Sequence, residues 1–182
     1  MKAQLTQKFE RLEHLRADIG RQLALVSDEL ANQSPVPGAW SAVQVVAHLQ
    51  QIEDAYYRYL TKKLQHADDL KRQTTWEMLR YSLLKPYLYS PIKFKAPKGP
   101  ASDLPEYLEV VEAMERWATT RQKWQDLLGN FPPKHLYHAV AKHPMTGRMR
   151  MDQLLDFFFW HGDRHRKQIE RTLAAVKAAR PA

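Results

Sequence analysis

The sequence predicts an all-α protein: a four-helix bundle, formed by a single domain over residues 1–182, with a long irregular connection between its second and third helices. Three observations predict this fold class. Four long segments repeat their apolar residues every three or four positions, as amphipathic helices do. Segments rich in proline and glycine separate them. We find no pattern typical of a β-hairpin, and no internal repeat, along the sequence.

The first predicted helix covers residues 3–31, and residues 32–39 end it because two prolines and a glycine cannot continue a helix. Its apolar side is formed by Leu5, Phe9, Leu12, Ile19, Leu23, Val26 and Leu30. The second predicted helix begins at Ser41, since Ser41 and Gln44 have the residue types and the spacing of a capping box. This helix is expected to end near Leu64.

The connection to the third helix is the least regular part of the sequence. A short helix is expected over residues 74–84, but residues 85–100 contain four prolines, which should prevent regular structure. Long connections in compact helical domains are often functional. Two roles stay open: the connection covers the mouth of a pocket with Tyr87, Tyr89 and Phe94, or these aromatic side chains pack it across the bundle.

The third predicted helix begins near Asp103, with Pro105 in its first turn, and ends at Gly129 and Asn130. The fourth predicted helix covers residues 151–178.

Composition limits the chemistry that this chain can perform. Its 28 Lys and Arg residues against 20 Asp and Glu residues give a net charge of +8, which favours anionic partners only in a general way. There is no cysteine, so the chain forms no disulfide, has no thiol nucleophile, and would hold a metal ion by imidazole or carboxylate groups. No segment is apolar and long enough for a secretion signal or a membrane span, so we expect a cytoplasmic protein without membrane contact.

Three histidines are predicted to face the core. His161 and His165 lie one helical turn apart on a mainly apolar stripe of the fourth helix, and His48 lies on a similar stripe of the second helix with Val45 and Ile52. A buried polar group without a partner costs about 1–3 kcal/mol. The rings therefore either form hydrogen bonds with backbone or tyrosine groups, or bind one metal ion together, and their spacing favours the metal ion.

A site of this kind would be open. Neutral imidazoles bind Zn²⁺, Ni²⁺ and similar ions rather than Mg²⁺ or Ca²⁺. Three protein ligands leave a coordination position for water or substrate, which is typical of catalytic sites. Metalloprotease chemistry is disfavoured, because Gly162 occupies the position where zincins carry their glutamate base, and Asp163 is predicted to point away from the ligands. The sequence leaves open whether Glu53 or a loop residue reaches the site.

Several polar residues are weaker candidates for contacts with the ligands or with a bound cofactor. Gln44, Gln51 and Gln168 have the residue type that orients metal ligands by hydrogen bonds, and Gln168 is the best candidate because it shares the ligand stripe. The alternative is that they are ordinary surface glutamines. Arg121 lies on an otherwise apolar stripe, where it would contact an anionic substrate group or extend its aliphatic stem over the core.

These residues together resemble the DinB-like (DinB/YfiT) superfamily of metal-dependent enzymes. The resemblance covers nearly the whole chain and is carried by Trp40-Ser41, His48-Leu49 with Glu53, residues 94–97, Arg121, His143-Pro144 with Gly147, His161 with His165, and Gln168-Ile169. It implies a four-helix bundle of unusual connectivity, often a homodimer, in which His48, His161 and His165 bind Ni²⁺ or Zn²⁺. One departure is Arg150, where the family commonly has a Ser or Thr that caps the last helix.

The resemblance also implies classes of reaction. Characterised relatives include transferases and isomerases that use a low-molecular-weight thiol such as bacillithiol, mycothiol or glutathione. Our leading hypothesis is a metal-dependent thiol S-transferase that acts on small electrophilic substrates. A metal-dependent hydrolase is the second hypothesis, and a non-catalytic stress-response or ligand-binding protein is the third. Binding of nucleic acid is disfavoured, since we find neither a helix-turn-helix pattern nor basic residues interleaved with aromatic ones.

Overall fold

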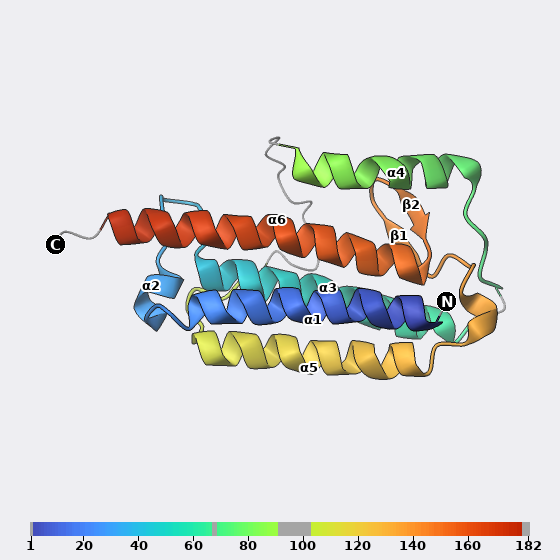
Figure 1. Cartoon of the computed structure of the whole chain (residues 1–182), viewed down its shortest axis with the longest axis horizontal. Helices are drawn as coiled ribbons and strands as arrows, with labels where there is room; N and C mark the ends of the chain where they lie inside the picture. Colours follow the sequence, from blue (N-terminus) through green and yellow to red (C-terminus); the bar gives the residue numbers. More distant parts are fainter. Residues whose placement is uncertain (1, 67–68, 91–102, 180–182) are drawn as a thin grey trace.

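The structure, a computed structural model, describes residues 2–66, 69–90 and 103–179. Four long helices lie side by side (Figure 1): α1 (Lys2–Leu23), α3 (Ala42–Leu64), α5 (Val110–Gly129) and α6 (Met151–Ala178). Each contacts two neighbours, in the order α1, α6, α3, α5 and back to α1. The predicted four-helix bundle is confirmed.

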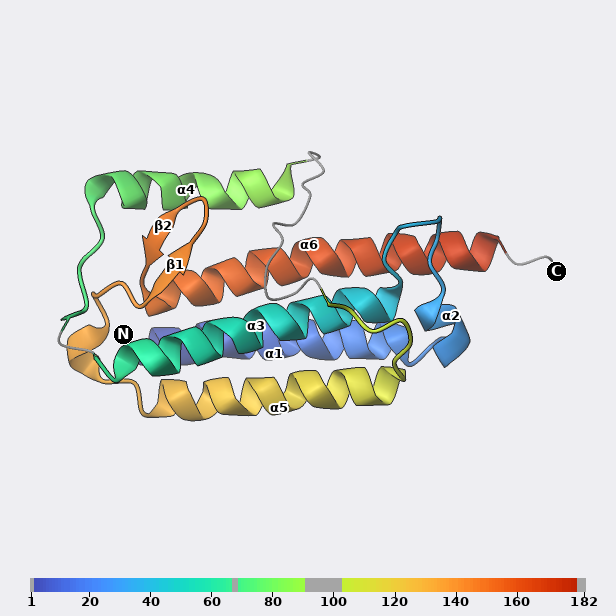
Figure 2. The same ribbon diagram turned by 180° about the vertical axis from the view of Figure 1, so that it is seen from behind.

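The connectivity of the bundle explains its long connection. α1 and α6 run in one direction, whereas α3 and α5 run in the opposite one (Figures 1 and 2). Because the adjacent helices α3 and α5 are parallel, the chain must travel back along the bundle between them. A further helix, α4 (Thr75–Tyr89), makes much of this return on the outside of α6.

The first helix is shorter than the sequence predicts. α1 ends at Leu23, and a separate helix, α2 (Asp28–Asn32), follows it, so the prediction of one helix over residues 3–31 is wrong. Ser27 caps α2, its Oγ accepting a hydrogen bond from the backbone N–H of Leu30 at 3.4 Å. Leu30 is buried and continues the apolar period of α1, which is why periodicity alone did not reveal the break.

The start of α5 also differs from the prediction, because α2 supplies its cap. α5 begins at Val110 rather than near Asp103. The side chain of Asn32 exchanges hydrogen bonds of 3.0 and 3.1 Å with the backbone of Leu108, and Asp28 Oδ1 accepts one of 2.7 Å from the Val110 N–H. The carboxylate at the helix start therefore comes from a different element, which local sequence does not reveal.

The starts of α3 and α6 agree with the predictions. Gln44 N–H donates to Ser41 Oγ at 3.2 Å and Ser41 N–H donates to Gln44 Oε1 at 3.0 Å, which confirms the capping box of α3. At α6, the Arg150 N–H donates to Gln153 Oε1 at 2.9 Å. This bond supports the helix start although Arg150 has no capping side-chain oxygen.

α4 extends beyond the predicted helix over residues 74–84. It continues through Pro86 to Tyr89, so the expectation that residues from 85 onward lack regular structure is wrong as far as Tyr89. A proline inside a helix leaves the carbonyl four residues earlier without its bond. Here that residue is Ser82, which is exposed, so water can serve the carbonyl. Phe94 belongs to residues 91–102, which lie outside the described residues.

A β-hairpin that the sequence analysis did not predict lies between α4 and α6 (Figure 2). Strand β1 (Ala141–His143) pairs antiparallel with β2 (Gly147–Met149), and a short 3₁₀ helix, η2 (Pro133–His135), precedes them. Strands of three residues give too short an alternating pattern to recognise. The available signal was Gly147, which has a positive φ of 77° in the turn.

The core consists of two apolar clusters that follow each other along the bundle. One surrounds Trp124 and the first half of α6, and the other surrounds Trp117 and the second half of α1. α1 and α6 approach closely at Gly162, where a Cβ would lie 2.8 Å from the Leu15 side chain. Within the described ranges, no helix has the length and apolarity that crossing a membrane requires.

Candidate metal centre

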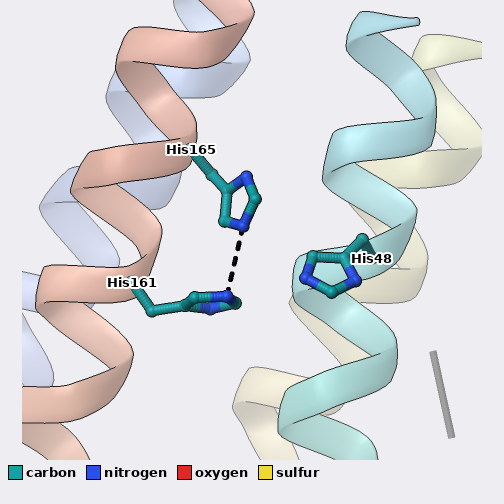
Figure 3. A group of neighbouring side chains, drawn as sticks. All are labelled: His48, His161 and His165. Carbon is teal, nitrogen blue, oxygen red and sulfur yellow. Dashed lines mark hydrogen bonds between the residues drawn. The ribbon is translucent and has the colours of Figure 1, made fainter. Parts of the chain in front are cut away.

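Three imidazoles from two helices converge in the interior of the bundle (Figure 3). His48 comes from α3, and His161 and His165 come from α6. One ring nitrogen from each lies within 4.8 Å of the others. The ring centroids of His48 are 5.4 Å from His161 and 5.0 Å from His165. The structure thus brings together the three histidines that the helical periodicity predicted to face the core.

The two histidines of α6 have a spacing that suits a shared ion. Their Nε2 atoms are 3.1 Å apart and share a hydrogen bond. Two nitrogen ligands at about 2.0–2.1 Å from a tetrahedral zinc ion would be about 3.3 Å apart. The nitrogens of His161 and His165 therefore already have nearly the separation that two ligands of one ion require.

Gln168 orients the imidazole ring of His165. Its Oε1 lies 2.9 Å from His165 Nδ1, one helical turn further along α6. An amide oxygen accepts, so this contact places the hydrogen of the neutral ring on Nδ1 and leaves a lone pair on Nε2, the atom that faces His161. Gln168 is the glutamine that the sequence analysis ranked first.

Burial keeps the imidazoles of α6 neutral. Burial, together with the neighbouring imidazoles, lowers the pKa of His161 well below its usual value. Burial and the nearby His48 lower the pKa of His165 to about 3. At neutral pH both rings therefore retain lone pairs that a metal ion can use.

Aromatic rings cover the cluster on two sides. Trp40 lies over His48, with ring centroids 4.9 Å apart, and stacks at 6.5 Å on His165. Phe157 stacks on His161 at 5.3 Å with an interplanar angle of 23°. His48 is only 4% exposed, whereas the two rings of α6 are partly exposed. The cluster is therefore largely enclosed by protein, and burial is most complete at His48.

The sequence analysis named Trp40 only as part of the family resemblance and did not predict its contact with the histidines. Trp40 is partly exposed and contacts two of the three imidazoles. The signal that could have revealed it is its place directly before Ser41, the N-cap of the helix that carries His48.

Arg121 and Glu53 form a buried ion pair with each other. Arg121 donates from Nε to Glu53 Oε2 at 2.6 Å and from Nη2 to Oε1 at 2.8 Å, and Trp117 Nε1 donates to Oε2 at 3.0 Å. Burial raises the pKa of Glu53, and the Arg121 charge acts in the opposite direction. Both side chains are thus engaged between α3 and α5, and the metal-ligand group among the described residues contains neither of them.

The other polar candidates also have partners elsewhere. Gln44 caps α3 and donates from Nε2 to the Pro105 carbonyl at 3.0 Å, and Gln51 donates to the Asp103 carbonyl at 3.0 Å. Asp163 pairs with Arg166 at 2.9 Å and accepts from the hydroxyl of Tyr89. Within the part of the chain that the structure describes, the ligand cluster therefore consists of imidazoles without a carboxylate.

Two surface cavities of about 430 Å³ each are lined by none of the three clustered histidines, His48, His161 and His165. One is lined by Arg72, Gln73, Met78, Tyr137 and Arg150. The other is lined by Tyr57, Thr61, Leu64, Asp126, Leu127, Asn130, Phe131, Pro132 and His135. Neither contains a ligand cluster of the described residues, so the chemistry of the side chains identifies the site better than cavity size does.

Comparison with known proteins agrees with this fold. A family model described as the DinB superfamily matches residues 7–169. Among solved structures, the chain is similar to YfiT from Bacillus subtilis, described as a probable metal-dependent hydrolase with an unusual four-helix bundle topology. The TM-score is 0.59 at 17% identity, over 94% of this chain and 87% of YfiT. A conserved protein from Enterococcus faecalis matches with a TM-score of 0.51 at 16% identity, over 97% and 95%. No curated protein matches the chain. At such identities the structural likeness shows the fold.

Proposed function

The chain belongs to the DinB superfamily, and from this membership and the three converging imidazoles we propose that it is a metal-dependent enzyme acting on a small molecule. The observation that carries the proposal is the group of His48, His161 and His165, whose ring nitrogens lie within 4.8 Å of one another on two rigid helices. We propose these three residues as the metal ligands.

The donor set fits a transition metal ion. Three neutral imidazoles suit Zn²⁺ or Ni²⁺, and they lack the oxygen atoms that Mg²⁺ and Ca²⁺ prefer. The 3.1 Å separation of the two α6 nitrogens and the orientation of His165 by Gln168 support the same assignment. When bound, such an ion would supply a Lewis acid that lowers the pKa of a coordinated water or thiol.

The residues of the chain would contribute position and shielding. Trp40 and Phe157 cover the rings and keep water from two sides of the cluster. Gln168 holds one ring in the tautomer that leaves its Nε2 free of hydrogen. We propose that a substrate approaches the cluster past His161 and His165, which are less completely buried than His48.

We propose thiol transfer to a small electrophile as the reaction class, with a low-molecular-weight thiol as cosubstrate. The described ligand cluster contains no carboxylate that would act as a general base. A thiol, with an ordinary pKa of about 8.5, needs far less assistance to ionise than water, whose pKa is much higher. The chain has no cysteine, so the thiol must come from a second molecule.

Metal-dependent hydrolysis is the second candidate function. The description of YfiT as a probable metal-dependent hydrolase favours it, since the two proteins share their fold. Two further proposals come from the sequence analysis, namely a cytoplasmic location, which rests on the expected lack of a secretion signal, and a homodimer, which rests on the family resemblance alone. Sedimentation equilibrium of the purified protein would test the dimer directly.

Metal analysis tests the proposed ligands. We expect about one Ni²⁺ or Zn²⁺ ion per chain after loading and desalting, and far less in His161→Ala. The matched control is His14→Ala, which removes an exposed histidine of α1 and should leave the metal content unchanged. Equal metal content in His161→Ala and the original protein would show that His161 is not a metal ligand and would contradict the proposed site.

Turnover assays on the metal-loaded protein separate the reaction classes. The electrophile 1-chloro-2,4-dinitrobenzene is offered with glutathione, bacillithiol or mycothiol, and p-nitrophenyl acetate is offered without any thiol. Thiol-dependent turnover that disappears in His161→Ala supports the transferase. Turnover of the ester without thiol supports the hydrolase. Stoichiometric metal binding without any turnover would favour a non-catalytic protein.

A further inference from the structure

A fourth imidazole lies directly beside the histidine cluster without belonging to it. His143, the last residue of β1, contacts Phe157 in an edge-type arrangement, with ring centroids 4.7 Å apart and an interplanar angle of 63°. Phe157 in turn stacks on His161 at 5.3 Å. His143 is close enough for its charge to influence the pKa of His161. The β-hairpin thus places the imidazole of His143 against Phe157, the ring that also contacts the proposed ligand His161.

The hairpin that carries His143 is held by two helices. From α3, the Tyr56 hydroxyl donates to the Lys142 carbonyl at 3.4 Å. From α4, Glu77 Oε1 accepts a hydrogen bond of 3.1 Å from the backbone N–H of Arg148. These contacts fix both strands, so the position of His143 is set by the fold.

The protonation pattern of His143 follows from its own turn. The backbone N–H of Met145 donates to His143 Nδ1 at 3.2 Å, so that nitrogen must carry the lone pair. In the neutral ring the hydrogen is therefore on Nε2. Burial supports the neutral form, since it lowers the pKa of His143 to about 4. Among the described residues, Nε2 has no hydrogen-bond partner, and its ring is only partly buried.

We propose that His143 is a substrate-binding residue whose Nε2–H donates a hydrogen bond to an oxygen atom of the substrate held at the His48, His161 and His165 site. The inference rests on the proposed function and narrows its substrate class to small electrophiles that carry a carbonyl or similar oxygen acceptor. A neutral imidazole with a fixed N–H donor stabilises negative charge that develops on such an oxygen.

Binding of acetohydroxamate, a small metal ligand with a carbonyl oxygen, tests this role. Its affinity is measured by calorimetry on the zinc-loaded protein and on two variants. His143→Phe keeps a ring against Phe157 but lacks the donor, and we expect binding about tenfold weaker. His143→Gln carries an amide N–H at a similar reach, and we expect binding within about threefold of the original protein. Equal affinities for the original protein and His143→Phe would overturn the proposal.

Two measurements separate the test of His143 from the test of the proposed function. Zinc content is determined first, and failure of the original protein to bind about one ion per chain would overturn the proposed function itself. If all three proteins bind the ion, differences in acetohydroxamate affinity report on His143 alone. Long-range ¹H–¹⁵N correlation spectra of the original protein should show the His143 hydrogen on Nε2. A spectrum with the hydrogen on Nδ1 would overturn the proposal even if the variants do not fold.

Discussion

His143, His161 and His165 share one property, which is that burial lowers the pKa of each ring. In the unfolded chain these rings would bind a proton near pH 6.5. In the folded chain they stay neutral to much lower pH. The contribution of these rings to the free energy of unfolding therefore depends on the difference in their pKa values between the folded and the unfolded state.

Mild acid should destabilise the metal-free protein. Because these pKa values are lower in the folded state, the unfolded chain binds more protons between about pH 6.5 and pH 4. The stability contribution is thus complete above about pH 6.5; the part from His143 is lost as the pH falls to about 4, and the part from His165 is lost only at about pH 3. Each neutral ring contributes at most about 1.4 kcal/mol per pH unit to the slope. Urea unfolding at pH 7, 6 and 5 measures the slope.

The control for this pH dependence is His143→Phe, which removes one of the three titrating rings and should give a shallower slope. A free energy of unfolding that does not change from pH 7 to pH 5 would contradict the lowered pKa values.

At the residue scale, the sequence predicted the histidines better than it predicted their neighbours. His161 and His165 follow from a one-turn spacing, and His48 from the register of one helix, so local periodicity was sufficient. The partner of Arg121 could not be predicted in this way. Its carboxylate, Glu53, lies 68 residues away on a different helix, and only the packing of α3 against α5 brings the two together.

At the element scale, Gly147 combines two requirements that only glycine meets. Its φ is +77°, and a Cβ at this position would lie 3.0 Å from Glu77 Oε1. Gly147→Ala should therefore lower the free energy of unfolding by about 1–3 kcal/mol, since both the backbone conformation and the contact with α4 are disturbed. Chemical denaturation measures the loss.

The matched control is Gly129→Ala in α5. Apart from its chain neighbours and the backbone of its own helix, no atom lies within 4 Å of the Cβ that this substitution would add, and Gly129 has no positive φ. The control should leave the stability unchanged or raise it slightly. Equal stability of the two variants would show that the hairpin does not depend on its turn glycine.

The element boundaries that the sequence predicted wrongly share one physical cause. The start of α5 depends on Asp28 and Asn32 of α2, and the hairpin depends on bonds from α3 and α4. These partners are distant in sequence. The start of α3 was predicted correctly because its capping box is formed by residues three apart.

At the scale of the whole molecule, the Glu53–Arg121 pair connects three helices. Arg121 of α5 bonds Glu53 of α3, and its Nη1 lies 3.5 Å from Glu13 of α1. Arg121→Met would leave a buried carboxylate without its charged partner, so we expect a loss of about 3–5 kcal/mol in the free energy of unfolding. Denaturation in urea measures it.

The double variant Glu53→Gln/Arg121→Met is the control, because it removes both charges and keeps an acceptor for Trp117. It should be more stable than Arg121→Met alone. If the single and double variants unfold at the same urea concentration, the ion pair does not hold the bundle in the way the contacts indicate.

Metal ions should stabilise the entire bundle, since the proposed ligands belong to α3 and α6 and are far apart in the unfolded chain. With Zn²⁺ at about one hundred times its dissociation constant, the expected gain is about 2.7 kcal/mol, measured as a rise in the unfolding temperature. The gain should be absent in His161→Ala and preserved in His14→Ala. A similar rise in all three proteins would place the binding outside the histidine cluster.

The fold class was predictable from the sequence, but the course of the chain from one helix to the next was not. Helical periodicity gave the bundle and the resemblance gave its family, whereas the parallel neighbours α3 and α5 are a property of packing that no single segment encodes. The long connection was visible in the sequence, and its cause, the return along the bundle, became clear only from the arrangement of the helices.

The fluorescence of Trp40 should report on binding at the histidine cluster. Because the indole ring lies against two of the three imidazoles, a metal ion or a proton bound to them should change its fluorescence. A paramagnetic ion such as Ni²⁺ quenches emission from an adjacent indole, and protonated imidazole does so as well. Titrations can therefore be followed by light alone, and a Trp40→Phe variant identifies the share of the signal that originates at the site.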